Sequence, residues 1–240
     1  HAPRLLSKAQ EITNYLQSLS IEQLAKGMHI SPSLATKTHQ LIAGWSTLPD
    51  RQSPAIDSFV GDIYSGLQTP TFSKADREYA DRVLYILSGL YGVLRPLDGV
   101  CPYRLEMGYR LPGSPWPDLY AFWNTQIMDC IPQEGPIINV SSVEYSRTVI
   151  PYIDPARIIT PRFLTVDPKT QQPTFVVVHA KIARGAFAHW LIKTRTVRIN
   201  DLVNFDEIGY AYHPALSTPA EPVFVCKEFG GKGLSMRLIK

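Results

Sequence analysis

The sequence has few of the residues that build disulfide frameworks and metal centres. Its 240 residues include three cysteines and six histidines. Cys101, Cys130 and Cys226 lie far apart, and an odd number of isolated cysteines without a C-x-x-C pair argues against both a disulfide framework and a zinc site. No histidines have H-E-x-x-H or another close ligand spacing. We therefore expect no metal and no cofactor, and the alternative left open is a metal site assembled from distant residues.

Long apolar runs are also missing. No stretch reaches the roughly 18 apolar residues that a membrane-spanning helix needs. The first residues, His1-Ala2-Pro3-Arg4, lack the apolar segment of a signal peptide. If the chain is complete, we expect a cytoplasmic protein without a membrane partner. With 45% hydrophobic and 19% charged residues, the chain can bury a sizeable core and lies far from the disordered class.

The excess of positive charge is small overall but locally concentrated. The formal net charge is +3. Five cations and no acid occur in one stretch, namely Lys181, Arg184, Lys193, Arg195 and Arg198. The C-terminal segment adds Lys232, Arg237 and Lys240. Such a distribution is typical either of a nucleic-acid-binding surface or of an ordinary solvated basic face.

The first 45 residues carry helical patterns. Leu5, Ala9, Ile12, Leu16 and Leu19 recur at intervals of four and three, which predicts a helix over about residues 4–19. A capping box at 20–23 predicts the start of a second, short helix. A Ser-Pro pair at 31–32 predicts a third helix, which runs to about residue 45.

The rest of the chain mixes helices and strands. A helix is predicted from Ser73 through Leu87, ending near Gly89 or Gly92, and no long helix is expected over 95–118. Runs at 157–166 and 174–179 predict a hairpin around a turn at 167–170, and a helix follows over about 180–194. Short strands are expected at 136–140, 208–212 and 222–227. We therefore predict one α+β domain over residues 1–240, with a mixed β-sheet flanked by helices and a helical hairpin region near its N-terminus.

Two arginines lie in a segment rich in glycine and proline. Arg95 belongs to the run LSGLYGVLRPLD at 87–98, and Arg104 belongs to PYRLEMG at 102–108. Glycines let the backbone approach another surface, and guanidinium groups offer fork-shaped donors to phosphate. The alternative is a turn-rich structural segment in which Asp98 and Glu106 neutralise the arginines.

A polar cluster directly follows the strand predicted at 136–140. The segment NVSSVEY at 139–145 gathers two hydroxyls, a carboxylate and a phenol, and the carboxyl ends of strands are common ligand sites. Glu144 is a candidate general base there. The alternative is a helix cap, in which Ser141 or Ser142 binds backbone N–H groups and Glu144 completes the capping box.

Lys181 and Arg184 are three residues apart and so share a face of the helix predicted over 180–194. At a helix N-terminus the macrodipole disfavours cations, unless an anion joins them and takes the free N–H groups of the first turn. This arrangement predicts a phosphate site, against the alternative of a plain surface helix.

The segment LAKGMHISPSLA at 24–35 lies between two predicted short helices. It resembles a helix-hairpin-helix element, which in DNA-binding proteins presents backbone N–H groups to phosphates, with Lys26 in support. The alternative is a plain αα-hairpin that packs its apolar side chains.

Taken together, these segments resemble the YaaA peroxide-stress family. The matching segments include FVGDIYSGL at 59–67 and DLYAFW at 118–123, together with the runs at 87–98, 102–108, 139–145 and 181–185, and finally FDEIGY at 205–210. They occur in the family's order from about residue 11 to about residue 212. The resemblance implies one α+β domain with a positively charged cleft, a helix-hairpin-helix-like element, and double-stranded or distorted DNA as the ligand. It implies a role in limiting oxidative DNA damage and no established catalytic reaction.

The sequence departs from the family pattern at several points. The usual opening strand with Ser-Pro-Ala-Lys-Thr is missing, and Ser141-Ser142-Val143 stands where relatives often have Ala-Ser. Ile182 replaces the second lysine of Lys-Lys-Ala-Arg-Gly, and Cys226 replaces the arginine of a late Phe-x-Arg. Each lost cation weakens phosphate binding, so we expect a lower DNA affinity or a pocket adapted to another ligand.

Two functional hypotheses follow, besides the weaker one of an interaction module without a small ligand. The first is a DNA-binding stress protein whose phosphate contacts come from Lys26, Arg95, Arg104, Ser141, Lys181 and Arg184. The second is an enzyme that acts on a nucleotide or another small anionic substrate, held by the same cations. Its candidate catalytic residues are Glu144 as base and Tyr103 or Tyr145 as acid or orienting group. Both hypotheses expect Arg104, Glu144 and Lys181 to converge on one site.

Overall fold

The computed structural model describes residues 1–234, so Arg237 and Lys240 of the basic C-terminal segment lie outside the described residues. The chain forms two compact units, each assembled from segments distant in sequence. The first unit comprises His1–Ser58, Asp81–Gln133 and Ser142–Ile153. The second comprises Phe59–Ala80, Glu134–Ser141 and the chain from Asp154 onward. Both contain helices and strands, which confirms the α+β class. The single-domain organisation stays a prediction.

The first unit is mainly helical. Its helices are α1 (Leu6–Gln17), α2 (Ile21–Met28), α3 (Pro32–Ala43), α4 (Ala55–Ser58), α7 (Leu119–Trp123) and α8 (Val143–Ser146). Its strands form two short antiparallel pairs, β1 (Ser53–Pro54) with β4 (Gly99–Val100) and β2 (Ile86–Ser88) with β3 (Gly92–Leu94).

The second unit contains most of the sheet. Its helices are α5 (Asp62–Leu67), α6 (Lys74–Val83, whose last residues belong to the first unit) and α9 (Val177–Thr194). Its strands are β5 (Ile137–Ile138), β6 (Ile158–Ile159), β7 (Arg162–Val166), β8 (Pro173–Thr174), β9 (Tyr210–Tyr212) and β10 (Val223–Cys226). Among residues 1–234, no helix is long and apolar enough to cross a bilayer.

The three N-terminal helices form as the sequence predicts. Ser20 Oγ accepts the N–H of Gln23 at 3.2 Å, and Ser20 N donates to Gln23 Oε1 at 2.9 Å, which completes the expected capping box. Ser31 caps α3 through the N–H of Leu34, with proline at the first helical position. Ala9, Ile12 and Leu16 of α1 are buried, so the apolar stripe faces the core.

The end of α6 differs from the prediction. The helix ends at Val83 instead of continuing through Leu87 to Gly89 or Gly92. Ile86, Leu87 and Ser88 form β2 and pair with Leu94, Val93 and Gly92 of β3. Leu87 therefore belongs to a hairpin, because strand pairing within the core overrides the helical spacing of the leucines.

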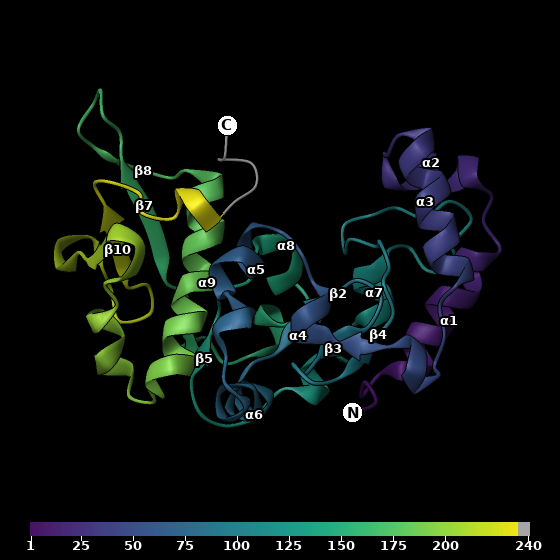
Figure 1. The fold of residues 1–240 in the computed structure, drawn as a ribbon, viewed down its shortest axis with the longest axis horizontal. Coiled ribbons are helices and arrows are strands. Elements are labelled where there is room, and N and C mark those ends of the chain that lie inside the picture. The colour runs from purple at the N-terminus through teal and green to yellow at the C-terminus, as the bar shows by residue number, and fades with distance from the viewer. Residues whose placement is uncertain (235–240) are drawn as a thin grey trace. The chain divides into compact units, whose positions relative to one another are not determined.

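A four-stranded mixed sheet lies beside α9 in the second unit (Figure 1). Its order is β8-β7-β10-β9, with β7 and β10 parallel and the outer pairs antiparallel. The predicted hairpin forms, although both of its strands are shorter than expected, and the two C-terminal strands are confirmed. The core of the unit is aromatic, with edge-on and stacked contacts among Phe163, Phe187, Phe205 and Phe224.

Helix α9 begins three residues earlier than predicted. The expected strand over 174–179 ends at Thr174, and the helix starts at Val177. Three successive valines favour a strand locally, but Ala180, Ala183 and Phe187 bury one helical face in the core. Tertiary packing therefore decides the conformation of this segment.

Helices α5 and α9 approach each other closely at two glycines. A Cβ atom on Gly66 would lie 2.0 Å from the carbonyl oxygen of Ile182, and one on Gly185 would lie 1.9 Å from that of Ile63. Any side chain at either position would force the two backbones apart. The contact therefore fixes the face of α9 that carries Gly185 against α5.

Candidate functional site

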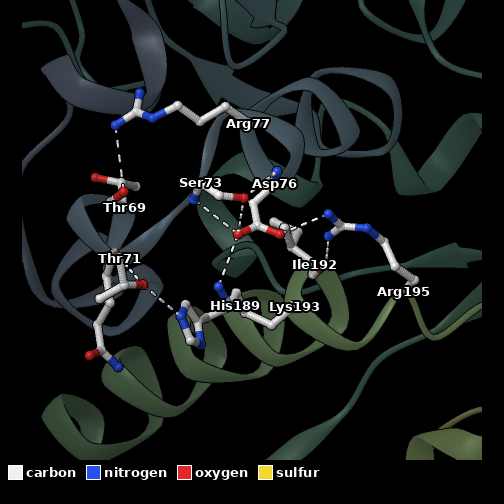
Figure 2. Close-up of polar contacts among 10 residues, drawn as sticks. Thr69, Thr71, Ser73, Asp76, Arg77, His189, Ile192, Lys193 and Arg195 are labelled. Carbon is white, nitrogen blue, oxygen red and sulfur yellow. Dashed lines mark hydrogen bonds and ion pairs between the residues drawn. The ribbon is translucent and has the colours of Figure 1, made fainter.

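The basic run on α9 divides into paired and unpaired cations. Near the C-terminal end, Lys193 Nζ lies 2.9 Å from one carboxylate oxygen of Asp76, and an Arg195 nitrogen lies 2.7 Å from the other (Figure 2). The guanidinium of Arg195 also lies 4.4 Å from the ring centroid of Tyr79 and donates to the carbonyl of Ile192.

Asp76 is the centre of this network. It is buried and also accepts hydrogen bonds from the N–H (3.0 Å) and hydroxyl (2.8 Å) of Ser73 at the start of α6. The hydrogen bonds from Lys193 and then from Ser73 hold the pKa of Asp76 well below its usual range. The Asp76 cluster, defined here as Ser73, Asp76, Lys193 and Arg195, therefore has a structural role, and its two cations are neutralised.

The remaining cations of the run differ. Arg198 forms an exposed ion pair of 2.8 Å with Asp201. Lys181 is exposed and Arg184 is half-buried, and neither has a hydrogen bond or ion pair with another residue of the described chain. Burial lowers the pKa of Arg184, since it disfavours the charged form.

Lys181 and Arg184 do not lie at the N-terminus of α9, so the prediction of a phosphate site at the start of this helix is wrong. Because α9 begins at Val177, Lys181 is its fifth residue and Arg184 lies a further turn inside. The macrodipole and the free N–H groups act within the first turn, so they do not explain a phosphate site at this position. What remains is that the two side chains share a helix face, since they are three residues apart.

Arg95 has a carboxylate partner in the first unit. Its guanidinium lies 3.3 Å from Asp81, whose other oxygen accepts the N–H of Leu97 at 2.8 Å. Asp98 accepts the backbone N–H of Arg95 at 2.8 Å and not its guanidinium. Burial raises the pKa of Asp98. The arginine is thus neutralised, as the structural alternative expected, but by Asp81 instead of Asp98.

Arg104 is partly satisfied. A terminal nitrogen lies 3.3 Å from Glu106 and 3.3 Å from the hydroxyl of Tyr109. Its Nε atom is buried and has no hydrogen-bond partner in the described chain. This arginine retains donor capacity that the fold does not use.

Glu144 is held by the segment that carries Arg104. Its carboxylate accepts the N–H of Gly108 at 2.8 Å, and its carbonyl accepts the hydroxyl of Tyr120 at 3.0 Å. The capping box that the alternative expected does not form, because Ser142 makes no side-chain cap at the start of α8 and Glu144 binds Gly108. Ser141 donates its hydroxyl to Asn139 at 2.8 Å.

The two candidate tyrosines also belong to the first unit. The hydroxyl of Tyr103 lies 2.6 Å from that of Ser88, and its ring contacts Tyr91 edge-on. Tyr145 is half-buried in α8, next to Glu144 in sequence. The roles of both tyrosines in catalysis stay predictions.

Lys26 lies in the last turn of α2, where it is exposed and has no partner in the part of the chain that the structure describes. The turn after it bonds back to α2, from the N–H of His29 to Lys26 and from that of Ile30 to Ala25. A helix-hairpin-helix element would direct such N–H groups to phosphates. The helical hairpin is confirmed, and its identity as a DNA-binding element stays a prediction.

The predicted site residues fall into two sets. The first unit holds Lys26, Arg95, Tyr103, Arg104, Glu144 and Tyr145, and the second holds Ser141, Lys181 and Arg184. Within the first unit, Glu144 and the segment 102–108 meet at Gly108. Convergence of the two sets on one site stays a prediction. Among residues 1–234, no group of three His, Cys, Asp or Glu side chains is arranged to hold a metal ion.

Comparison with known proteins identifies the family. The family described as "Peroxide stress protein YaaA" matches residues 1–216. The chain belongs to this family.

Relatives support the assignment along nearly the whole chain. A protein of Salinispora tropica, described as a UPF0246 protein, is 57% identical over 235 residues, covering 98% of this chain and 89% of the relative. A UPF0246 protein of Ruegeria sp. strain TM1040 is 38% identical over 230 residues, covering 93% of this chain and 90% of the relative. The resemblance seen in the sequence motifs is confirmed.

Proposed function

We propose that this member of the peroxide stress family binds DNA through phosphate contacts that do not depend on base sequence. The proposal rests on a difference among the cations on and after α9, some of which form ion pairs while others do not. Three of them pair with aspartates, whereas Lys181 and Arg184 share a helix face and have no partner among the described residues. A phosphate group is the partner that such a pair of cations binds most readily.

Burial of Arg184 strengthens this argument. A half-buried guanidinium without a carboxylate partner loses hydration without gaining an ion pair. An anion that docks there supplies the missing partner. Structural cations elsewhere in the second unit, such as Lys193 and Arg195, are already satisfied by Asp76.

The helical hairpin of the first unit offers a second basic surface. Lys26, Lys37 and Arg110 are exposed and have no partner in the described chain, and no acid occurs between Gln23 and Pro49. Gly27 lies against the backbone of Arg110, so α2 and this arginine are adjacent. Exposed cations of this kind contribute to affinity through counterion release.

Arg95 and Arg104 receive a smaller role in this proposal. The first is paired with Asp81 and the second with Glu106 and Tyr109. A phosphate would have to compete with these partners. We therefore assign the main phosphate contacts to Lys26, Lys181 and Arg184.

A salt titration tests the proposal. Binding of a fluorescent 20-base-pair duplex is measured by anisotropy at about 50 and about 200 mM salt, with free nucleotides as competitors. We expect a steep fall in affinity and little dependence on base sequence. Lys181→Ala should lower the slope of log affinity against log salt by about 1. Lys74→Ala is the matched control, because Lys74 is an exposed lysine that is already paired with Glu78. An affinity that does not change with salt, or free nucleotides that bind more tightly than the duplex, contradicts the proposal.

A further inference from the structure

Three side chains of the second unit form a series of hydroxyl, imidazole and carboxylate. Nε2 of His189, on α9, lies 3.0 Å from the hydroxyl oxygen of Thr71 (Figure 2). Nδ1 of the same ring lies 3.8 Å from a carboxylate oxygen of Glu207. Thr71 belongs to the short turn Thr69–Thr71 and Glu207 to the turn Glu207–Gly209, so distant segments bring the three groups together. The same order of groups activates the nucleophile of serine hydrolases.

The imidazole of His189 is held in one orientation behind an accessible hydroxyl. The ring stacks on Phe72, with centroids 5.4 Å apart and an angle of 9° between the two planes. The side chain of His189 is only 13% exposed. Thr71, in contrast, is exposed. A reagent in solvent can therefore reach the hydroxyl, while the ring that contacts it is shielded.

The carboxylate of Glu207 decides which ring nitrogen carries the proton. Nδ1 of His189 is buried and has no hydrogen-bond partner among the described residues, because 3.8 Å is too long for a hydrogen bond. In the neutral ring, a proton on Nε2 would leave a lone pair on Nδ1 that faces a negative charge. A proton on Nδ1 points at the carboxylate instead, so this tautomer is favoured. Nε2 then keeps its lone pair and faces the hydroxyl of Thr71 as a proton acceptor.

The hydroxyl of Thr71 has one proton and two acceptors within reach. The carbonyl oxygen of Gln68 lies 2.8 Å away and Nε2 of His189 lies 3.0 Å away. A hydroxyl rotates about its C–O bond and can donate to either acceptor. When it donates to the imidazole, the two groups form a pair of nucleophile and general base.

The other charges around His189 come from α9, from α6 and from the segment before Glu207. Lys193, one turn further along α9, pairs with Asp76 of α6 at 2.9 Å. Arg77, also on α6, donates to the carbonyl of Thr69 at 3.5 Å. Asp206 is exposed next to Glu207 in sequence. Glu207 is the carboxylate that lies against the ring, and its charge favours the imidazolium that forms when the hydroxyl gives up its proton.

We propose that Thr71 accepts acyl groups from an activated donor, a thioester or an aryl ester, with His189 as general base and Glu207 as positioning residue. The hydroxyl oxygen attacks the carbonyl carbon of the donor. A C–O bond forms to Thr71, and the bond between the acyl carbon and the leaving sulfur or oxygen breaks. The proton of the hydroxyl passes through Nε2 of His189 to the leaving group, so the products are an O-acyl threonine and a free thiol or phenol. This reaction does not depend on DNA binding.

Acetylation of the full chain by p-nitrophenyl acetate tests the proposal. Peptide mapping by mass spectrometry measures the acetyl ester at each threonine, so that acetylated lysines do not contribute. Thr36 is the internal control. It is also exposed and donates to a main-chain carbonyl, that of Pro32 at 3.0 Å, but it has no histidine partner among residues 1–234. We expect Thr71 to react at least about 100-fold faster than Thr36, the scale of general base catalysis.

Two variants assign the roles of the imidazole and the carboxylate. His189→Gln should lower the rate at Thr71 by about 100-fold and leave the rate at Thr36 unchanged. In Glu207→Gln the amide can donate to Nδ1 and favour the opposite tautomer, so the rate at Thr71 should also fall. The wild-type rate should rise between about pH 5 and about pH 8, where imidazoles lose their proton. In Glu207→Gln the pH of half-maximal rate should be lower, because no carboxylate favours the imidazolium.

Each result has a definite reading. Equal rates at Thr71 and Thr36 in the folded wild type overturn the proposal, and this comparison needs no variant. A His189→Gln chain that acetylates Thr71 at the wild-type rate overturns the assignment of the base. If Glu207→Gln keeps both the rate and the pH profile of the wild type, the carboxylate does not position the imidazole, and that part of the proposal is wrong.

Discussion

The two ends of helix α9 carry the same kind of residue for different purposes. Near the C-terminal end, Lys193 and Arg195 surround the buried carboxylate of Asp76 and connect α9 to the start of α6 (Figure 2). In the N-terminal half, Lys181 and Arg184 have no partner among residues 1–234. In the sequence both pairs belong to one basic run without acids. The difference shows that the partner contributed by a distant segment decides whether a cation stabilises the fold or remains available to a ligand.

Removal of the carboxylate from the Asp76 cluster should have the largest effect of the changes considered. Asp76→Ala leaves Lys193 and Arg195 without their counterion and removes the carboxylate half of the capping box with Ser73 at the start of α6. We expect the largest fall in the midpoint of urea unfolding among all the variants proposed here. Asp50→Ala, at an exposed position of the turn Pro49–Arg51, is a control carboxylate in the first unit. A variant as stable as the wild type would show that the cluster contributes nothing to the fold.

Changes in the N-terminal half should affect binding instead of folding. Lys181→Ala and Arg184→Ala should each weaken binding to duplex DNA by about 1–3 kcal/mol, the scale of a charge-assisted hydrogen bond. Anisotropy titrations measure the affinity, and urea unfolding should show midpoints close to that of the wild type for Lys181→Ala. If Lys181→Ala unfolds at a lower urea concentration than the wild type and binds DNA with the same affinity, the two ends of α9 do not differ in this way.

Acid should weaken the structural end of α9 first. The pKa of Asp76 is lowered in the folded state, so the unfolded chain takes up this proton at a higher pH than the folded chain does. The contribution of the carboxylate is therefore fully present above about pH 5 and is lost as the pH falls below that value. Asp76→Asn should flatten the dependence of stability on pH in this acidic range. Thermal unfolding of the wild type and the variant at a series of pH values checks the slope.

The smallest effect on DNA binding is expected from a cation at the structural end. Lys193→Ala removes the same charge as Lys181→Ala, but Lys193 is already engaged with Asp76. Its affinity for the duplex should change much less than that of Lys181→Ala in parallel titrations. Equal losses of affinity in the two variants would mean that net charge, and not the absence of a partner, governs binding.

The sequence predicts the local features of the fold well. Ser20 with Gln23 and Ser31 with Pro32 identify the starts of α2 and α3, because caps and proline act within a single turn. The hairpin of β7 and β8 is equally local. The segment around Leu87 and the valines before α9 were predicted wrongly, because contacts with other parts of the chain decide their conformation.

The site could be predicted only in part for the same reason. The motifs select Lys181, Arg184 and Glu144, but no spacing indicates that Gly108 binds the carboxylate of Glu144. The role of Asp76 as the partner of two cations was missed, although its position three residues after Ser73 is a capping pattern. Nothing in the local sequence connects it to Lys193, because the two residues belong to distant segments.

The glycine contact between α5 and α9 also orders events during synthesis. Gly66 and Gly185 meet in the folded unit, although most of the chain's middle is translated between them. At about 5–20 residues per second, on the order of ten seconds separate their emergence from the ribosome. The last segment of the first unit, which ends at Ile153, is made before α9 exists. A ribosome that stalls before Val177 therefore leaves α5 without its helix partner and Asp76 without either of its cations.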